Sequence, residues 1–97
     1  MIDYEEAREI VEQHLAETAT GTPKLVLLDD ETMEEDFGWV FFYQSEEYLR
    51  SGSFADQLAG NAPIIVSKVD GSLHVTGTAH PVEVYIESFR RSGSPHG

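Results

Sequence analysis

The stretch from Phe37 to Tyr43 reads FGWVFFY and is the strongest strand candidate of the chain. Successive side chains of an extended strand point to opposite faces of a sheet. One face would then carry four aromatic side chains, Phe37, Trp39, Phe41 and Tyr43. The other face would carry Val40 and Phe42. A strand that is apolar on both faces is covered on both faces, so this stretch predicts a strand inside a sheet.

An acidic segment, residues 29–36 (DDETMEED), leads into this strand with six carboxylates in eight residues. We expect a solvated loop. Calcium-binding EF-hands need an oxygen ligand at loop position 5 and glycine at position 6. Counting from Asp29 places Met33 and Glu34 there, and counting from Asp30 also fails. A glycosidase pair needs one sheltered carboxyl with a raised pKa, and this segment contains no apolar shelter.

The first half of the chain predicts three further elements. Apolar residues at three- and four-residue spacing predict a helix over 4–17, capped by Asp3. Its apolar stripe comprises Tyr4, Ala7, Ile10, Val11 and Leu15. Residues 24–28 (KLVLL) predict a short strand. Residues 45–49 either extend the aromatic strand or begin a helical turn, and a second capping pattern predicts a short helix over 54–58.

The second half predicts a hairpin and a closing helix. Residues 63–69 and 72–76 flank Asp70-Gly71, which favours a type I′ turn with positive φ at both residues. Ser72, His74 and Thr76 would then face solvent. The last helix would follow His80, with Pro81 at its first position. Its apolar stripe comprises Val82, Tyr85, Ile86 and Phe89, and Arg90 and Arg91 lie at its C-terminal end, where the helix dipole favours cations.

The predicted order is α-β-β-short α-β-β-α. Short connections favour antiparallel pairing, so we expect an α+β fold: a four-stranded antiparallel sheet with an N-terminal and a C-terminal helix packed on it. Ninety-seven residues suit one domain. We place this domain at residues 1–91, followed by a flexible tail at 92–97.

Charge and composition restrict the classes of partner. Eighteen acidic residues against six basic ones give a formal charge of −12, which argues against nucleic acids and anionic membranes. The charge suits a basic protein partner, or serves only solubility or a saline cytoplasm. The chain has no cysteine, no signal-peptide pattern and no apolar run of roughly 20 residues. We therefore expect a cytoplasmic protein.

The sequence shows no set of residues that would perform catalysis. The four histidines have no metal-ligand spacing, and no nucleophile-elbow motif or phosphate-binding loop is present. We expect no metal, no cofactor and no enzymatic activity. A small enzyme would instead need a pocket that holds a carboxylate or histidine with a shifted pKa.

The acidic segment and the aromatic strand together predict a partner-binding site. Carboxylates beside aromatic side chains suit a basic protein, because they combine ion pairs with apolar anchors. The candidate residues are Asp29, Asp30, Glu31, Glu34, Glu35, Asp36, Trp39 and Tyr43. The alternative is that the aromatic side chains are core, which stays open for Trp39.

Several pieces of the second half resemble the YrhB-like family of small bacterial proteins. They are residues 58–63 (LAGNAP), Asp70-Gly71, and residues 77–79 (GTA) followed by Pro81, within a resemblance that covers about 38–89. This family is grouped with the immunity protein 35 domain of polymorphic-toxin systems. The resemblance implies an immunity protein that neutralises a toxin, and the acidic segment is outside it.

The sequence is therefore compatible with two functions. The first is a non-enzymatic immunity protein that binds and occludes a basic toxin domain. The second is a holdase-type chaperone or housekeeping protein that suppresses aggregation. They differ in the partner, since only the first predicts a one-to-one complex. The chain itself could be a monomer, or a homodimer formed through a sheet edge.

Overall fold

The computed structural model describes residues 1–18, 25–52 and 62–96. Its helices are α1 (Tyr4–Thr18), α2 (Glu46–Ser51) and α3 (Val82–Ser92), with a 3₁₀ helix, η1, at Asp29–Glu31. The predicted terminal helices are confirmed. For residues 45–49 both predicted alternatives occur: strand β4 ends at Ser45, and helix α2 begins at Glu46. The predicted helix at 54–58 lies outside the described residues.

A four-stranded antiparallel sheet forms the centre of the fold. Its strands are β2 (Met33–Glu35), β3 (Gly38–Phe41), β5 (Ile64–Ser67) and β6 (Leu73–Val75), in the order β2-β3-β5-β6. A separate antiparallel pair joins β1 (Leu25–Leu27) to β4 (Tyr43–Ser45). The α+β class with a terminal helix at each end is confirmed, but the strands differ: β1 is outside the main sheet, and the acidic segment supplies β2.

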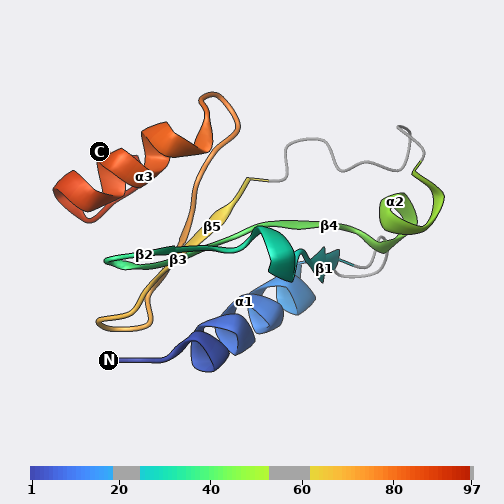
Figure 1. Ribbon diagram of the computed structural model, residues 1–97, viewed down its shortest axis with the longest axis horizontal. Coiled ribbons are helices and arrows are strands. Elements are labelled where there is room, and N and C mark those ends of the chain that lie inside the picture. Colours follow the sequence, from blue (N-terminus) through green and yellow to red (C-terminus); the bar gives the residue numbers. More distant parts are fainter. Residues whose placement is uncertain (19–24, 53–61, 97) are drawn as a thin grey trace.

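The two terminal helices cover opposite faces of the sheet (Figure 1). Under α1, the apolar residues Ala7, Val11, Leu15, Leu27, Trp39, Phe41, Ile64 and Val66 form one buried cluster. On the α3 side, a smaller cluster comprises Val40, Ile65, Ile86 and Phe89. Strand β3 contributes to both clusters, as its two apolar faces predict.

Gly38 changes the face that Phe37 occupies. The sequence places Phe37 with Trp39 and Phe41, but the Phe37 ring packs on the α3 side, 4.8 Å from the Phe89 ring centroid. The predicted alternation is wrong here because the strand begins only at Gly38, whose φ is +151°. Residue 37 therefore belongs to the tight turn between β2 and β3, where the alternation of a strand does not apply.

The turn between β5 and β6 is longer than predicted. Ser67 N–H donates to Ser72 O at 2.9 Å, and Gly71 N–H donates to Ser67 O at 2.9 Å, which closes a four-residue loop. Gly71 has a φ of +72°, and no described non-glycine residue has a positive φ, so the type I′ turn is wrong. Asp70 instead accepts a hydrogen bond from Ser72 N–H at 3.0 Å, an Asx-type turn that needs no positive φ at the aspartate.

Two residues that the sequence predicts to face solvent, His74 in β6 and Thr76 just after it, are partly or fully covered. His74 lies on the α3 side, with its ring 4.9 Å from that of Phe89 and its Nε2 2.9 Å from Ser72 Oγ. Thr76 is 5 % exposed, and its hydroxyl donates to Pro63 O at 2.6 Å. The prediction fails for His74 because Phe89 of α3 packs against its ring. It fails for Thr76 because the hydroxyl and the N–H of Thr76 both donate to Pro63 O.

The segment after α3 folds back over the end of β6. Gly93, with a φ of +80°, ends the helix and donates its N–H to Phe89 O at 2.7 Å, the usual role of a glycine in this position. Ser94 O then accepts a hydrogen bond from Ser88 Oγ at 2.9 Å. Pro95 is buried, and the His96 imidazole donates to Val75 O over 2.9 Å.

Candidate partner-binding site

The acidic segment is ordered, and the prediction that it forms a loop is wrong. Asp29–Glu31 make one turn of 3₁₀ helix, and Met33–Glu35 form β2, which pairs with β3. Met33 explains the difference, because its side chain packs against the core on the α3 side. The single apolar side chain of Met33 packs β2 onto the core, but one apolar residue gives no alternation that would predict a strand from the sequence.

Arg8 of α1 holds the first carboxylate of the segment. Its guanidinium donates from Nε to Asp29 Oδ1 at 2.8 Å and from Nη2 to Asp29 Oδ2 at 2.9 Å, while Nη1 lies 2.8 Å from Glu12 Oε1. Tyr4 OH adds a contact to Asp29 Oδ1 at 3.4 Å. The hydrogen bonds from Arg8 lower the pKa of Asp29. Such a bidentate pair fixes direction as well as distance, so η1 is tied to α1.

Arg90 of α3 holds the other end of the segment. Its Nη2 donates to Glu35 Oε1 at 2.7 Å and its Nε to Asp36 Oδ1 at 3.3 Å. The guanidinium also lies 5.6 Å from the centroid of the Phe37 ring, within the range of a cation–π contact. The hydrogen bond to Asp36 raises the pKa of Arg90. The acidic segment is therefore fastened to both helices.

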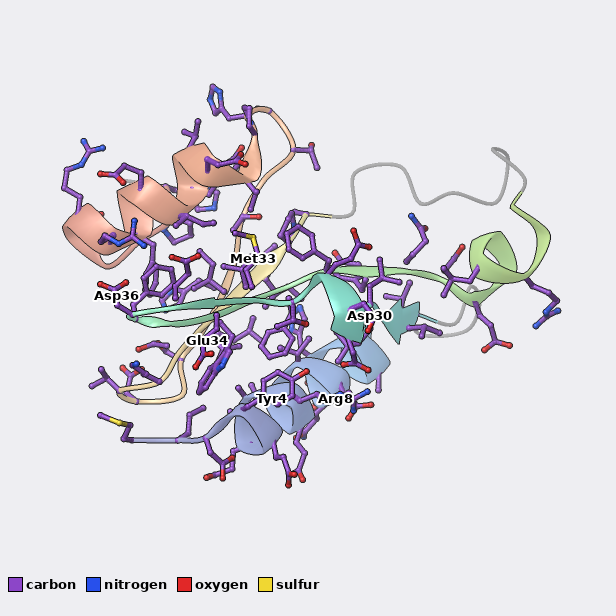
Figure 2. The ribbon with its side chains drawn as sticks, in the orientation of Figure 1. Tyr4, Arg8, Asp30, Met33, Glu34 and Asp36 are labelled. Atoms are coloured by element: carbon purple, nitrogen blue, oxygen red, sulfur yellow. The ribbon has the colours of Figure 1, made fainter. Side chains whose placement is uncertain are left out.

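Three carboxylates between these two anchors have no partner among the residues that the structure describes. Asp30, Glu31 and Glu34 are exposed, and across residues 1–18, 25–52 and 62–96 no hydrogen bond or ion pair reaches their side chains. Figure 2 shows Asp30 beside the end of α1 and Glu34 on the hairpin. Because the backbone that carries them is held at both ends, these carboxylates need little further ordering to bind a cation.

The two aromatic candidates have different positions. Trp39 is 6 % exposed in the cluster under α1, with its ring edge-on to Tyr4 at 6.2 Å. The structure therefore assigns Trp39 to the core. Tyr43 is partly buried against the same cluster, and burial raises the pKa of its hydroxyl. Trp39 lies opposite Glu34 in the β2–β3 pair, whereas Tyr43 lies opposite Leu27 in the β1–β4 pair.

The family of the chain follows from comparison with known proteins. The model of the immunity protein 35 family matches residues 5–91. The chain belongs to the immunity protein 35 family. That match extends over both anchoring arginines and the whole acidic segment, so it goes beyond the resemblance seen in the sequence.

A curated relative of this immunity protein 35 chain supports the same grouping. Over 52 residues the chain is 44 % identical to the uncharacterised protein YrhB of Escherichia coli strain K12. The matched region is 54 % of this chain and 55 % of YrhB, so the chain spans about half the length of that relative. No solved structure matches the chain significantly. The predicted resemblance to the YrhB-like and immunity protein 35 group is confirmed.

Sequence reasoning does not find the two arginines that anchor the acidic segment. The sequence predicts for Arg90 only a favourable interaction with the helix dipole, and it predicts no role for Arg8. One signal was available. The chain has six basic residues for eighteen acidic ones, so each arginine on a helix face is a candidate to pair with a carboxylate from elsewhere in the fold.

A groove lies between α3, the loop before it and the segment after it. It is lined by Thr78, His80, Val84, Tyr85, Ser88 and His96 among others, with a volume of about 610 Å³. His80 and His96 each lie 5.9 Å from the Tyr85 ring.

In the described part of the chain no three His, Cys, Asp or Glu side chains converge as metal ligands. None of its helices has the length and apolar character of a bilayer span.

Proposed function

We propose that this chain neutralises a cognate bacterial toxin by binding it, without catalysis of its own. Membership of the immunity protein 35 family supports an immunity role and a protein toxin as the partner. The observation that carries the finer proposal is the fastened acidic segment. Its carboxylates Asp30, Glu31 and Glu34 have no partner within the described part of the chain. A surface of this kind favours a toxin domain that is basic around its active site.

The charges would act first on the rate of association. With a net charge of −12, the chain attracts a basic domain before contact, and steering of this kind raises association rates steeply at low salt. The ordered contact surface then determines how long the complex lasts. Bound in this way, the chain blocks access to the active site of the toxin, in the cytoplasm where both proteins would meet.

The proposal predicts a toxin gene next to the gene of this chain, and it is tested by co-expression of this chain with the products of the neighbouring genes. We expect co-expression to rescue growth and the two purified proteins to form a one-to-one complex. Growth arrest despite co-expression, together with no complex, would overturn the proposal. If the chain instead suppresses the aggregation of unrelated proteins and forms no one-to-one complex, the holdase function is the correct one.

A charge-reversal variant tests the role of the acidic segment in that complex. Replacing Asp30, Glu31 and Glu34 by lysine should slow association at least about tenfold at low salt, because steering depends on the local potential. The matched control replaces three exposed carboxylates on the helices, Glu5, Glu9 and Glu83, and makes the same change in net charge. Equal rates for the two variants would show that only the overall charge matters and would place the interface elsewhere.

A further inference from the structure

The main sheet has two edges, and the chain itself occupies one of them. At the β6 edge, the segment after α3 folds back so that His96 caps the carbonyl of Val75 at 2.9 Å. Pro95 is buried beside it. A strand edge that is covered by the protein's own chain is protected from pairing with another chain. The β6 edge is therefore closed near its C-terminal end.

The edge formed by β2 is not closed in this way. Strand β2 is last in the order β2-β3-β5-β6, and in the part of the chain that the structure describes no strand lies beyond it. Every second residue of an antiparallel edge strand points its N–H and C=O away from its neighbour. The β2–β3 hairpin lies between the levels of α1 and α3 (Figure 1). Its outer side thus presents backbone donors and acceptors together with carboxylates.

The charge of β2 discriminates between possible partners. Two of its three residues are Glu34 and Glu35, Asp36 follows in the turn, and Asp30 and Glu31 precede it. Pairing with β2 of a second copy would bring carboxylates opposite one another, and like charges in a cross-strand pair are destabilising. A strand with lysine or arginine at alternate positions would pair favourably instead. The acidic edge thus disfavours self-association and favours a basic strand.

We propose that the partner adds a strand to this sheet: an extended segment with alternating basic residues pairs with the outer edge of β2. This inference rests on the proposed function and specifies the part of the toxin that is recognised. Backbone hydrogen bonds to β2 would supply affinity, and the carboxylates would supply the preference for basic side chains. Arg8 and Arg90 would act as positioning residues, because they hold the edge strand in place and do not contact the partner.

A synthetic peptide tests the inference without the toxin. The probe is a six-residue peptide of alternating lysine and valine, mixed with the full chain labelled with ¹⁵N. We expect the largest amide shift changes at residues 33–35, and slowed amide exchange at Glu34, whose N–H points away from β3 in this register. The same peptide with N-methylated backbone amides should bind at least about tenfold more weakly, since the loss of a single backbone hydrogen bond already removes up to roughly that factor. A peptide of alternating glutamate and valine should not bind.

Two variants of the protein complete the test. Glu34→Lys should remove most of the binding of the lysine peptide, whereas Glu9→Lys, on the outer face of α1, should change it little. Equal binding of the N-methylated peptide, or shift changes centred on β6, would overturn the inference. The growth-rescue experiment has a separate outcome: if the toxin is neutralised but the Glu34 amide stays unprotected in the complex, the proposed function stands and the added strand does not.

Discussion

Gly38 occupies the position where the acidic segment meets the core. Its φ of +151° is unfavourable for any residue with a side chain, and a β-carbon built there would overlap the carbonyl oxygen of Val66. The close approach lets β3 pair directly with β5 while the chain turns into β2. A residue with a β-carbon would have to push β5 away, and with it the sheet on which the candidate site rests.

We predict that Gly38→Ala destabilises the protein by about 3 kcal/mol or more, because it combines an unfavourable φ with a backbone clash. The control is Gly93→Ala. Gly93 also has a positive φ, but nothing lies within 4 Å of the position of its β-carbon, so we expect a cost of about 1–2 kcal/mol. Urea denaturation measures both. Similar costs for the two variants would show that the contact with Val66 is relieved by a small shift.

At the scale of elements, the acidic segment is defined by its two anchors. Asp29 binds Arg8 of α1, and Glu35 binds Arg90 of α3. The 3₁₀ turn and β2 are therefore held by helices on opposite faces of the sheet. Each ion pair is partly exposed, so each contributes little to stability. Their larger effect is on order, because they restrict where the free carboxylates lie.

We predict that the contribution of Asp29 depends on pH. Arg8 lowers its pKa below the ordinary 3.8, so the stabilisation is complete above that value and is lost as pH falls through the lowered pKa. Asp29→Asn should therefore be less stable than the parent protein by about 0.5–1 kcal/mol at pH 7, after allowance for the exposure of the pair. This difference should shrink below pH 3.8 in thermal melts. A difference that persists at low pH would mean that the charge of Asp29 is not the cause.

We predict that Arg90→Gln loosens β2 without unfolding the sheet. The variant loses the charged contacts to Glu35 and Asp36, so local opening of the hairpin should become easier. Amide exchange at residues 33–35 should accelerate about two- to fivefold, which corresponds to the loss of a surface ion pair. Residues 64–67 of β5 serve as the internal control and should keep their protection. Faster exchange throughout the sheet would indicate a global effect.

The elements that the sequence predicts well are those with local causes. The stripes of α1 and α3, the cap at Asp3 and the two apolar faces of β3 follow from spacing alone, and the structure confirms them. Strand β2 could not be predicted in the same way, because one methionine among carboxylates shows no alternation. The anchors of the site join Arg90 to Glu35 across 55 residues, and such a pairing depends on topology rather than on local pattern.

At the scale of the whole molecule, the fold leaves its two sheet edges in different states. The segment after α3 covers the end of β6. In the described part of the chain no strand lies beyond β2, and the carboxylates of β2 protect that edge by charge. The chain as a whole carries −12, which keeps copies apart at low ionic strength. Self-association therefore depends on two separate barriers, one of packing and one of charge.

We predict that a variant ending at Gly93 self-associates at high salt. It lacks the His96 contact to Val75 O and the buried Pro95, so the β6 edge is open. About 1 M salt reduces the screening length to roughly 3 Å and removes most of the repulsion between copies. Sedimentation velocity at low and high salt measures the effect, with the full chain as the control. If both chains sediment alike at high salt, the folded-back segment is not what protects this edge.

The anchoring of the acidic segment by residues from both ends of the chain also has a consequence for timing. Glu35 is synthesised 55 residues before the arginine that holds it. At a synthesis rate of roughly 5–20 residues per second, the delay is roughly 3–11 s. During that interval the carboxylates exist on a nascent chain without the geometry proposed for recognition. Protection against a toxin would then begin only when translation has passed Arg90, so a ribosome stalled late in the message would yield a chain with the right charges and no fixed surface to present them.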